Sequence, residues 1–304
     1  MIARTPYADL PGALVDELVL AGLDPEDVYR MVVRAFDEDL PDGGRDVTSS
    51  AMPPMGHGTG DIGAREPGVV AGLGVAELVF VYALGAEVVV SDRVADGARV
   101  AAGDVVMTVS GPVQDLLTAE RTALNFASHL SGVATATSHW VAALEGTRAR
   151  VLDTRKTLPT YRSLQKYAVR CGGGVNHRLS LADRAMVKDN HVIAAGGVVP
   201  AYELVRAANP TLRVEVEVTD LDQLEQLLDA GCTEILLDNM DCPTMAEAVR
   251  LVERRGASGR ATLEASGGLT LERAREVAET GVDFISVGAL THSVKVFDLG
   301  LDLR

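Results

Sequence analysis

Basic side chains are concentrated between residues 153 and 191, although the chain as a whole is acidic. The 304-residue chain has a net charge of −15 at pH 7. So dense a set of cations in an acidic protein predicts that an anionic ligand binds here. The basic residues that support this prediction are Arg155, Lys156, Arg162, Lys166, Arg170, His177, Arg178, Arg184 and Lys188.

Lysine is the rarer of the two strong cations in this chain. Of the 28 lysine and arginine residues, only four are lysines, at positions 156, 166, 188 and 295. A lysine retained against such a bias indicates a position that needs a compact, mobile ammonium group. Lys156 and Lys188 each follow a strand-like segment, so we take both as candidate catalytic residues. Chance is the alternative for any single lysine.

Composition and length limit the classes of protein to which the chain can belong. With 47% hydrophobic and 23% charged residues, it is typical of a soluble globular protein of one large or two ordinary domains. The sequence contains no evident secretion signal or membrane span, and three cysteines without metal-ligand spacing fit reduced thiols in the cytoplasm. The net acidity argues against nucleic-acid binding, so we expect a small anionic ligand.

The first half of the chain mixes helical and strand-like segments. The spacing of apolar residues predicts one or two helices over 12–40, irregular chain up to about residue 66, and strand-like structure over 67–111. A helix over 114–145 follows, with Gly132 as its expected break. These segments predict a domain of mixed α and β structure that precedes the cationic stretch.

The helix predicted over 114–145 has one polar face of particular interest. Arg121, Asn125 and Ser128 share this face because they are spaced at i, i+4 and i+7. The face is either a solvated stripe or a means of holding Arg121 over a neighbouring site. The sequence leaves both interpretations open.

A second helix is predicted over 158–170, within the cationic stretch. It places Arg162, Lys166 and Arg170 on one face, which we expect to be solvated because like charges at this spacing repel each other. The three glycines after this helix let the backbone bend tightly before His177. That histidine either donates to a carboxylate or holds the loop.

After residue 148 strand and helix candidates alternate. Such alternation is typical of a parallel sheet with helical crossovers, either open or closed into a barrel. Polar residues follow the carboxyl ends of these strands, where the catalytic groups of an α/β barrel gather. We therefore expect Lys156, Lys188, Glu217 and Asp238 to meet at one site. The strand candidates are 149–153, 184–188, 213–218, 233–238, 261–265 and 283–287, and the clearest helices are 220–230, 244–255 and 270–280.

Two features of this expected site indicate phosphate and metal binding. Small-residue turns follow the last two strands, where barrels commonly bind phosphate, and the first turn precedes a helix N-terminus. The carboxylates of Glu217 and Asp238 suit Mg²⁺, ribose hydroxyls, or both, and an ion pair with Lys188 is the alternative. The residues of the two turns are Ser266, Gly267, Gly268, Val287, Gly288 and Ala289.

Long motifs run through nearly the whole chain after residue 40. They begin with DVTS and AERTALNFASHLSG and continue through LDTRKTLPTYRSLQKYAVRCGGGVNHRLSLADRAMVKDNH. EVEV, ILLDN, LEASGG, VGALTHSV and DLGLDL complete the set. Together they closely resemble the motifs of the quinolinate phosphoribosyltransferase family, and their length makes the resemblance far more specific than a short pattern.

The resemblance implies a fold, an assembly and a reaction. The fold would be an incomplete, seven-stranded α/β barrel over 131–290, preceded by an N-terminal α/β sandwich domain over 1–130, to which the C-terminal tail 291–304 returns. The assembly would be a homodimer in which the partner subunit completes each active site, with hexamers left open. The reaction would transfer phosphoribosyl from phosphoribosyl pyrophosphate to quinolinate with decarboxylation, giving nicotinate mononucleotide, CO₂ and pyrophosphate in de novo NAD biosynthesis.

The resemblance also implies roles for individual residues. Quinolinate's two carboxylates would be held by a set of cations, one of which crosses the dimer interface. Phosphoribosyl pyrophosphate and Mg²⁺ would face the lysines and the two carboxylates, which would bind the metal directly or through water, and the two turns would take the 5′-phosphate. The substrate-binding residues are then Arg121, which crosses the interface, Thr154, Arg155, Lys156, His177, Arg178, Lys188, Glu217, Asp238, Ser266, Gly267, Gly268, Val287, Gly288 and Ala289.

The chemistry of the residues agrees with this implied reaction. A planar dicarboxylate suits the bidentate fork of arginine, and a pyrophosphate leaving group needs Mg²⁺ and lysine. A ribosylated pyridinium ring can accept the electrons left when CO₂ departs, so we expect no further cofactor. Two alternatives remain at this point. One is a related phosphoribosyltransferase that acts on nicotinate or another acid, and the other is a catalytically silent anion-binding or assembly protein.

Overall fold

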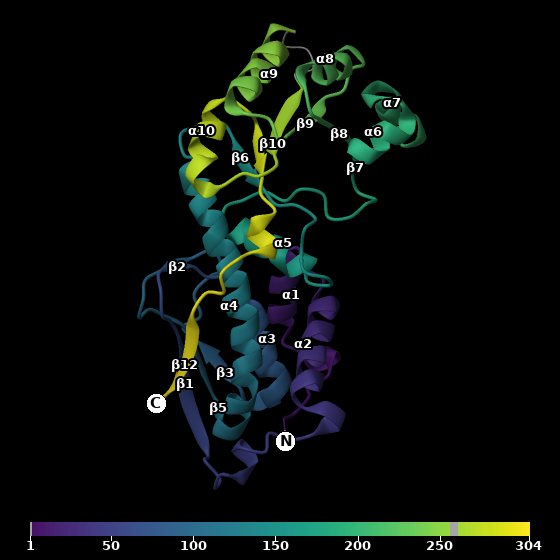
Figure 1. The fold of residues 1–304 in the computed structure, drawn as a ribbon. Coiled ribbons are helices and arrows are strands. Elements are labelled where there is room, and N and C mark those ends of the chain that lie inside the picture. Colours follow the sequence, from purple (N-terminus) through teal and green to yellow (C-terminus); the bar gives the residue numbers. More distant parts are fainter. Residues whose placement is uncertain (1, 256–260) are drawn as a thin grey trace. The chain divides into compact units, whose positions relative to one another are not determined.

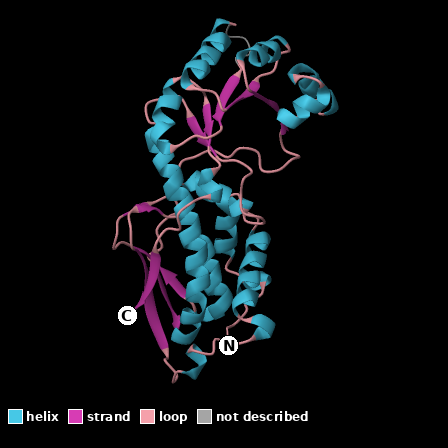
Figure 2. Ribbon diagram, viewed as in Figure 1, coloured by secondary structure: helices cyan, strands magenta, loops and turns pink. Residues whose placement is uncertain are grey.

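The computed structural model describes residues 2–255 and 261–304. Within these residues the chain forms two compact units. The first contains the residues up to Ala136 together with Ser163–Gly173 and Val294–Arg304, and the second contains Thr137–Arg162 and Gly174–Ser293. Each unit has its own principal sheet, which can be followed in Figures 1 and 2.

The first unit is built on an antiparallel sheet of four strands in the order β12-β1-β5-β3. The C-terminal strand β12 pairs with β1, so segments from both ends of the sequence form this sheet (Figure 1). A separate pair is formed by β2 and β4. The strands are β1 (His57–Ala64), β2 (Gly68–Val69), β3 (Val89–Ser91), β4 (Arg99–Val100), β5 (Val105–Pro112) and β12 (Leu299–Leu303).

Helices pack beside this sheet. Helix α3 contacts β5 on one side and the pair α1 and α2 on the other, so it lies between the sheet and these two helices (Figure 1). The first unit contains helices α1 (Gly12–Leu20), α2 (Pro25–Asp39) and α3 (Leu73–Leu84). Helix α4 (Val113–Ala143) begins in the first unit and continues into the second, and nearly all of α5 (Arg162–Cys171) belongs to the first. Short 3-10 helices are η1 (Tyr7–Asp9), η2 (Pro41–Gly43), η3 (Ser49–Ala51) and η4 (Gly85–Glu87).

Two sequence predictions for the first unit are wrong. Strand-like structure was expected over 67–111, yet Leu73–Leu84 forms helix α3, of which almost every residue is buried. A helix buried on all sides has no polar face, so it lacks the amphipathic period by which helices are recognised. Irregular chain was expected up to residue 66, yet His57–Ala64 forms β1, whose glycine-rich sequence is held in register by β5 and β12.

Gly132 does not break helix α4, which runs without interruption from Val113 to Ala143. The glycine is explained by close packing instead. A Cβ atom at position 132 would lie 2.3 Å from the carbonyl oxygen of Lys295, which is too close for any side chain. The C-terminal segment therefore passes directly over the helix at a point where only glycine leaves room.

The prediction of a solvated face on the 158–170 helix is also wrong. The helix begins at Arg162, and its second basic residue, Lys166, is fully buried together with Gln165. Only Arg170 of the later two cations is exposed, and it donates to the carbonyl oxygen of Ala21. The i, i+4, i+8 spacing therefore did not correspond to one solvent-facing stripe.

The second unit is an α/β structure with a parallel sheet of six strands in the order β6-β11-β10-β9-β8-β7. This confirms the alternation of strand and helix, and each observed strand falls on a predicted one. An isolated parallel bridge joins Leu152 to Val175 beside β6. The strands are β6 (Arg150–Leu152), β7 (Ala185–Val187), β8 (Val214–Val218), β9 (Glu234–Asp238), β10 (Thr262–Ser266) and β11 (Phe284–Ser286).

The helices of the second unit connect these parallel strands. The predicted helices over 220–230, 244–255 and 270–280 are all present, the last beginning as a 3-10 turn. The elements are α6 (Asp189–Ala195), α7 (Val198–Ala208), α8 (Leu221–Asp229), α9 (Cys242–Arg254), η5 (Leu271–Arg273), α10 (Ala274–Glu279) and α11 (Ala289–His292). Among the described residues, none of the helices has the length and apolarity to span a bilayer.

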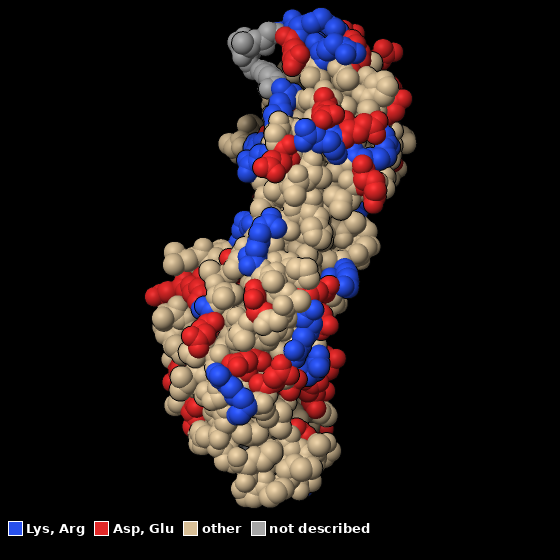
Figure 3. Space-filling view, turned by 90° about the vertical axis from the view of Figure 1, so that its left-hand side faces the viewer, with Lys and Arg blue, Asp and Glu red and all other residues tan. Residues whose placement is uncertain are grey.

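Charged side chains of both signs are interspersed on the surface in Figure 3. The basic residues on this face lie next to acidic ones in many places. Exposed ion pairs of the described residues include Arg255 with Glu225 at 3.1 Å and Arg275 with Glu279 at 2.7 Å. Exposed pairs of this kind contribute little to stability, so the surface charge pattern is not a guide to the functional site.

Candidate active site

A cavity of about 560 Å³ lies at the sheet of the second unit. The structure brings together there the predicted residues of the strand ends and of the first glycine turn. Met186, Leu236, Asn239, Glu264 and Ser286 were not singled out from the sequence. The cavity is lined by Thr154, Arg155, Lys156, His177, Arg178, Met186, Lys188, Glu217, Leu236, Asp238, Asn239, Glu264, Ser266, Gly267, Gly268 and Ser286.

The remaining predicted residues lie elsewhere. Arg121 lines a different cavity, in the first unit. Val287, Gly288 and Ala289 are not among the residues that line the cavity at the sheet. Gly288 nevertheless lies directly behind Lys156, because a Cβ atom at position 288 would be 3.0 Å from Cδ of that lysine. The second turn therefore lies next to the cavity, on the far side of Lys156.

Parallel strands explain why residues so far apart in sequence meet here. Lys188 directly follows β7, Glu217 lies near the end of β8, and Asp238 and Ser266 end β9 and β10. The register pairs Ser266 with Asp238, so these two strand ends lie side by side. Because all six strands run in one direction, their carboxyl ends form one edge, and the loops that carry functional groups gather at that edge.

Four cations of the cavity, which we call the cationic set, are Arg155, Lys156, Arg178 and Lys188. Burial, followed by the nearby charge of Arg155, lowers the pKa of Arg178. Nε of Arg155 is buried and has no hydrogen-bond partner among the described residues. Crowded cations and a buried donor without a partner are costly unless an anion satisfies them, so the cationic set is arranged for an anionic ligand.

The carboxylates of Glu217 and Asp238 face the same cavity from neighbouring strands. Nζ of Lys188 lies 3.0 Å from Glu217, so the ion pair expected as the alternative to metal binding is present. Asp238 accepts a hydrogen bond of 2.8 Å from the amide of Asn239. Hard carboxylate oxygens beside a site for anions also fit Mg²⁺, which takes one or two carboxylates together with phosphate oxygens and water. The ion pair and the metal site are therefore compatible.

The glycine turn after β10 has a backbone that only glycine adopts readily. Gly267 and Gly268 have φ angles of 92° and 58°. A Cβ atom at position 267 would lie 2.3 Å from the side-chain oxygen of Asn239, so any other residue would displace that amide. Asn239 itself has a φ of 53°, and its N–H donates to the carbonyl oxygen of Ser266 at 2.9 Å. The turn thus exposes backbone to the cavity without side chains in the way.

A buried cluster of His177, Glu215 and Glu264 borders the cavity, and its two glutamates were not singled out from the sequence. Nε2 of His177 is 2.9 Å from Glu215 and 3.4 Å from Glu264, and each side chain is at most 4% exposed. Nη2 of Arg184 lies 3.2 Å from the other oxygen of Glu215. The sequence did contain a signal for this cluster, because VEVEV and TLEAS each place glutamate within a buried strand. A charge on the inner face of such a strand requires a partner.

Protons in this cluster are held more tightly than in isolated side chains. Burial favours neutral His177, but hydrogen bonds to Glu215 and Glu264 outweigh burial and raise the pKa of His177 to about 9. Burial, followed by the charge of Glu215, raises the pKa of Glu264. The backbone N–H of Arg178 donates to Nδ1 of His177 at 2.7 Å, so Nε2 is the ring nitrogen that faces the two carboxylates.

The same three side chains could in geometry surround a metal, since their ligand atoms lie within 4.8 Å of one another. Oε2 of Glu264 has no hydrogen-bond partner among the described residues, but His177 and Glu215 are hydrogen-bonded to each other and Glu215 also pairs with Arg184. We therefore interpret the cluster as a hydrogen-bonded support of the cavity. The candidate metal ligands remain Glu217 and Asp238.

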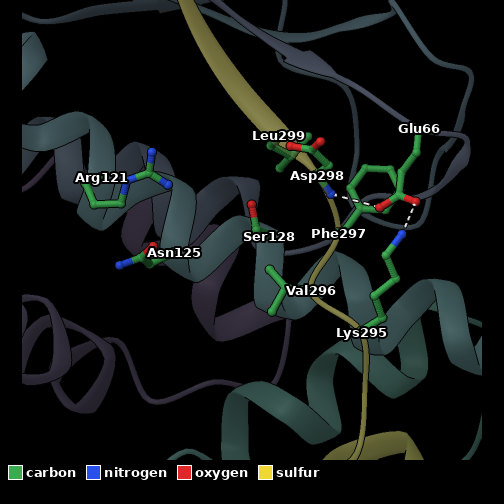
Figure 4. Close-up of a pocket in the computed structure, with 9 residues that line it drawn as sticks. All are labelled: Glu66, Arg121, Asn125, Ser128, Lys295, Val296, Phe297, Asp298 and Leu299. Carbon is green, nitrogen blue, oxygen red and sulfur yellow. Dashed lines mark hydrogen bonds and ion pairs between the residues drawn. The ribbon is translucent and has the colours of Figure 1, made fainter.

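The first unit contains a separate cavity of about 400 Å³, shown in Figure 4. Arg121, Asn125 and Ser128 of helix α4 line it, so their shared polar face borders a cavity. The opposite side is formed by Glu66 and the segment from Lys295 to Leu299. Glu66 accepts from Nζ of Lys295 at 2.6 Å and from the N–H of Asp298 at 3.1 Å (Figure 4).

The fold and the site define a class of protein. A cationic cavity at the carboxyl ends of parallel strands, with paired carboxylates and a glycine turn, is typical of α/β enzymes that act on anionic, phosphorylated substrates.

Comparisons with known proteins define the family. The model of the quinolinate phosphoribosyl transferase C-terminal domain matches residues 133–302, and that of the N-terminal domain matches residues 46–131. A nicotinate-nucleotide pyrophosphorylase [carboxylating] of Mycobacterium leprae is 52% identical over 272 residues, which are 89% of this chain and 95% of that protein. A mitochondrial quinolinate phosphoribosyltransferase [decarboxylating] of Nicotiana tabacum is 37% identical over 91% of this chain and 82% of that protein.

Solved structures agree with the sequence relatives. The nicotinate-nucleotide pyrophosphorylase of Francisella tularensis superposes with a TM-score of 0.86 at 37% identity, covering 92% of this chain and 96% of that one. The corresponding protein of Ehrlichia chaffeensis gives 0.85 at 33% identity, covering 90% and 98%. The chain belongs to the quinolinate phosphoribosyltransferase family, whose enzymes are transferases of pyridine nucleotide biosynthesis.

Proposed function

We propose that the enzyme transfers phosphoribosyl from phosphoribosyl pyrophosphate to quinolinate with decarboxylation, releasing nicotinate mononucleotide, CO₂ and pyrophosphate. The observation that carries this proposal is the cationic set, which faces the two carboxylates and the glycine turn across one cavity. A planar dicarboxylate and a phosphorylated sugar together need both halves of such a site. Membership of the family supports the same reaction.

Quinolinate is the substrate that the cationic set suits. Arg155 and Arg178 each offer a planar fork of donors that matches a carboxylate, and Nε of Arg155 is a buried donor without a partner. His177 borders the same cavity, and Thr154 offers a hydroxyl beside it. We assign these residues to the two carboxylates of quinolinate. Nicotinate, with a single carboxylate, would leave part of the set without a partner.

Phosphoribosyl pyrophosphate would occupy the other part of the cavity. The backbone of Ser266, Gly267 and Gly268, which lines the cavity, would take the 5′-phosphate together with the 287–289 turn, which lies next to Lys156. Glu217 and Asp238 would hold Mg²⁺, directly or through water, and would reach the ribose hydroxyls. When bound, Mg²⁺ supplies positive charge to the pyrophosphate oxygens. Lys156 and Lys188 would stabilise the charge that develops on the leaving group.

The reaction itself asks for positioning more than for acid or base chemistry. The pyridine nitrogen of quinolinate attacks C1′ of the ribose as the bond to pyrophosphate breaks. The ring is then a pyridinium, so it can hold the electron pair left at C2 when CO₂ departs, and C2 takes up a proton. The residues of the cavity orient the two substrates and exclude water from the charges that form.

We propose that the working assembly is a homodimer in which Arg121 acts on the partner subunit's site. Two observations support this role. Arg121 does not line the cavity of the second unit, and it makes no hydrogen bond or ion pair with any described residue. A cation that borders a cavity without an internal partner suits an anion from outside the chain. Assembly of dimers into hexamers would leave this role unchanged.

We further propose that the second unit is an incomplete α/β barrel of the family type and the first an α/β sandwich domain. The bridge between Leu152 and Val175 supports a seventh strand beside β6. The three cysteines, all unpaired, are consistent with an enzyme that works in the cytoplasm.

The test is a product assay with quinolinate, phosphoribosyl pyrophosphate and Mg²⁺, following nicotinate mononucleotide and CO₂ together. Both products should form from quinolinate, with little product when nicotinate replaces it. Efficient turnover of nicotinate would contradict the dicarboxylate assignment. Absence of turnover with either acid would contradict the enzymatic function. Omission of Mg²⁺ serves as the metal control, and activity should fall strongly without it.

A further inference from the structure

Arg178, one of the cationic set, is held at both ends of the residue. Its backbone N–H donates to Nδ1 of His177 at 2.7 Å, and its Nη1 donates to the carbonyl oxygen of Arg184 at 3.1 Å. Both holding residues contact the same buried carboxylate. Nε2 of His177 lies 2.9 Å from Glu215, and Nη2 of Arg184 lies 3.2 Å from its other oxygen. The two supports of Arg178 therefore converge on Glu215.

The environment of Glu215 fits this role better than a role in contact with substrate. Glu215 is only 1% exposed and is not among the residues that line the cavity. One oxygen of Glu215 lies 2.9 Å from Nε2 of His177 and the other lies 3.2 Å from Nη2 of Arg184, so the carboxylate contacts two neighbours at once.

A buried carboxylate between two buried apolar residues needs a reason. The neighbours of Glu215 in β8, Val214 and Val216, are buried and apolar, as the core of a parallel sheet requires. A well-packed apolar residue at position 215 would cost no more than a buried ion cluster and often less. Stability alone therefore does not account for Glu215, whereas its contacts with the two supports of Arg178 do.

We propose that Glu215 is a positioning residue, which fixes the guanidinium of Arg178 against a carboxylate of quinolinate by holding both His177 and Arg184. Glu264 also assists, since it lies 3.4 Å from the same Nε2 atom of His177. The inference rests on quinolinate being the substrate. Under this proposal Arg178 contacts the ligand, and Glu215 sets the geometry of that contact.

The decisive experiment is a double-mutant cycle between Glu215→Gln and Arg178→Ala, with KM for quinolinate and for phosphoribosyl pyrophosphate measured separately. Glu215→Gln should raise the quinolinate KM about 10-fold, which corresponds to about 1.4 kcal/mol, and should change the other KM less than about 2-fold. In the Arg178→Ala background the same substitution should add less than about 2-fold, because the residue through which it acts is gone.

Controls distinguish positioning from a general loss of structure. Glu77→Gln in the first unit removes a carboxylate that pairs with Arg93 at 3.0 Å, so it should lower the melting temperature without changing either KM. Glu215→Asp keeps the charge and shortens the side chain, so it should raise the quinolinate KM in the same selective way. This variant preserves the test if Glu215→Gln fails to fold.

Three outcomes would overturn the inference. The first is that the effects of Glu215→Gln and Arg178→Ala on the quinolinate KM multiply in the double variant. The second is an equal rise of both KM values in a Glu215 variant, and the third is an unchanged quinolinate KM in a folded Glu215 variant. The proposed function is judged separately from the wild-type enzyme alone. If the wild type does not turn over quinolinate, the function fails. Calorimetric titration of quinolinate into the same four proteins of the cycle then tests the positioning role directly.

Discussion

The two cavities of this protein treat their charges differently. In the first unit, Lys295 and Glu66 form an ion pair of 2.6 Å, and Glu66 also accepts from the backbone of Asp298, so these charges satisfy each other. In the second unit, cations crowd around one cavity, and Nε of Arg155 is buried without a partner. Lys188 of the same cavity pairs with Glu217 at 3.0 Å, so the contrast concerns the arginines: a buried donor left without a partner awaits a ligand, whereas the Lys295 pair serves the fold.

Arg121 is the exception that makes the comparison useful. It borders the cavity of the first unit, yet it makes no hydrogen bond or ion pair with any described residue, so by its contacts it resembles the cations of the second unit. The contacts of a charged side chain, and not the cavity on which it lies, therefore predict whether it binds a ligand. Substitutions that test it should differ by orders of magnitude in their effects.

The largest effect is expected for Lys156→Ala. Loss of a cation that stabilises the developing charge on pyrophosphate should lower kcat about 100-fold to 1,000-fold, with little change in melting temperature. Product formation and thermal unfolding measure the two quantities. Normal turnover in this variant would contradict the catalytic role of Lys156.

Arg121→Ala should lower activity about 100-fold if its guanidinium holds a substrate carboxylate in the partner subunit. Mixing this inactive variant with Lys156→Ala should restore roughly a quarter of the wild-type activity, since about half of all dimers would be mixed and each mixed dimer would carry one intact site of two. The activity of a refolded one-to-one mixture measures the effect. No recovery on mixing would mean that Arg121 does not act across the interface.

Arg155→Lys keeps the charge but loses the planar fork of donors. It should raise the KM for quinolinate about 10-fold to 100-fold while leaving the KM for phosphoribosyl pyrophosphate nearly unchanged. Steady-state kinetics with each substrate varied in turn provides the measurement. An equal effect on both constants would remove Arg155 from the dicarboxylate site.

The pH dependence of stability should report the buried cluster. The pKa of His177 is raised from 6.5 to about 9, so the folded protein keeps a proton that the unfolded chain loses. The resulting stabilisation is complete below pH 6.5 and is lost as the pH rises towards 9, by about 1 to 3 kcal/mol. Chemical unfolding at several pH values measures this slope, which should be shallower in His177→Asn. Identical slopes would contradict the raised pKa of His177.

The smallest effect is expected for Lys295→Ala. This lysine is 80% exposed at the side chain, and its ion pair with Glu66 should contribute less than about 0.5 kcal/mol. Activity should be unchanged, and chemical unfolding should detect at most a slight shift. A loss of activity comparable to that of Arg121→Ala would break the distinction between satisfied and unsatisfied charges.

Much of the second unit could be predicted from the sequence because its signals are local. Strand and helix candidates alternate with regular spacing, and Lys188, Glu217 and Asp238 stand where apolar strands end. Parallel strands place such residues on one edge whatever the details of packing. The first unit gave weaker signals, since helix α3 has no polar face and β1 is held by two strands distant in sequence.

The buried groups could not be predicted because their partners come from other elements. The spacing of the basic residues around Lys166 predicts a solvated helix face, yet Lys166 is fully buried. Glu215 and Glu264 stand within apolar strands, and nothing local in the sequence pairs them with His177. Gly132 is conspicuous in the sequence, but the passage of the C-terminal segment over it is a tertiary fact.

The sequence by itself determined the family, the order of strands and helices in the second unit, and the residue types that carry charge to the strand ends. Periodicity and motif spacing involve residues a few positions apart, so they can be recognised without knowledge of the fold. The tertiary structure decided which charges are satisfied internally, which stay available to a ligand, and that the supports of Arg178 converge on Glu215. Those facts depend on distances between residues tens of positions apart, which packing alone sets.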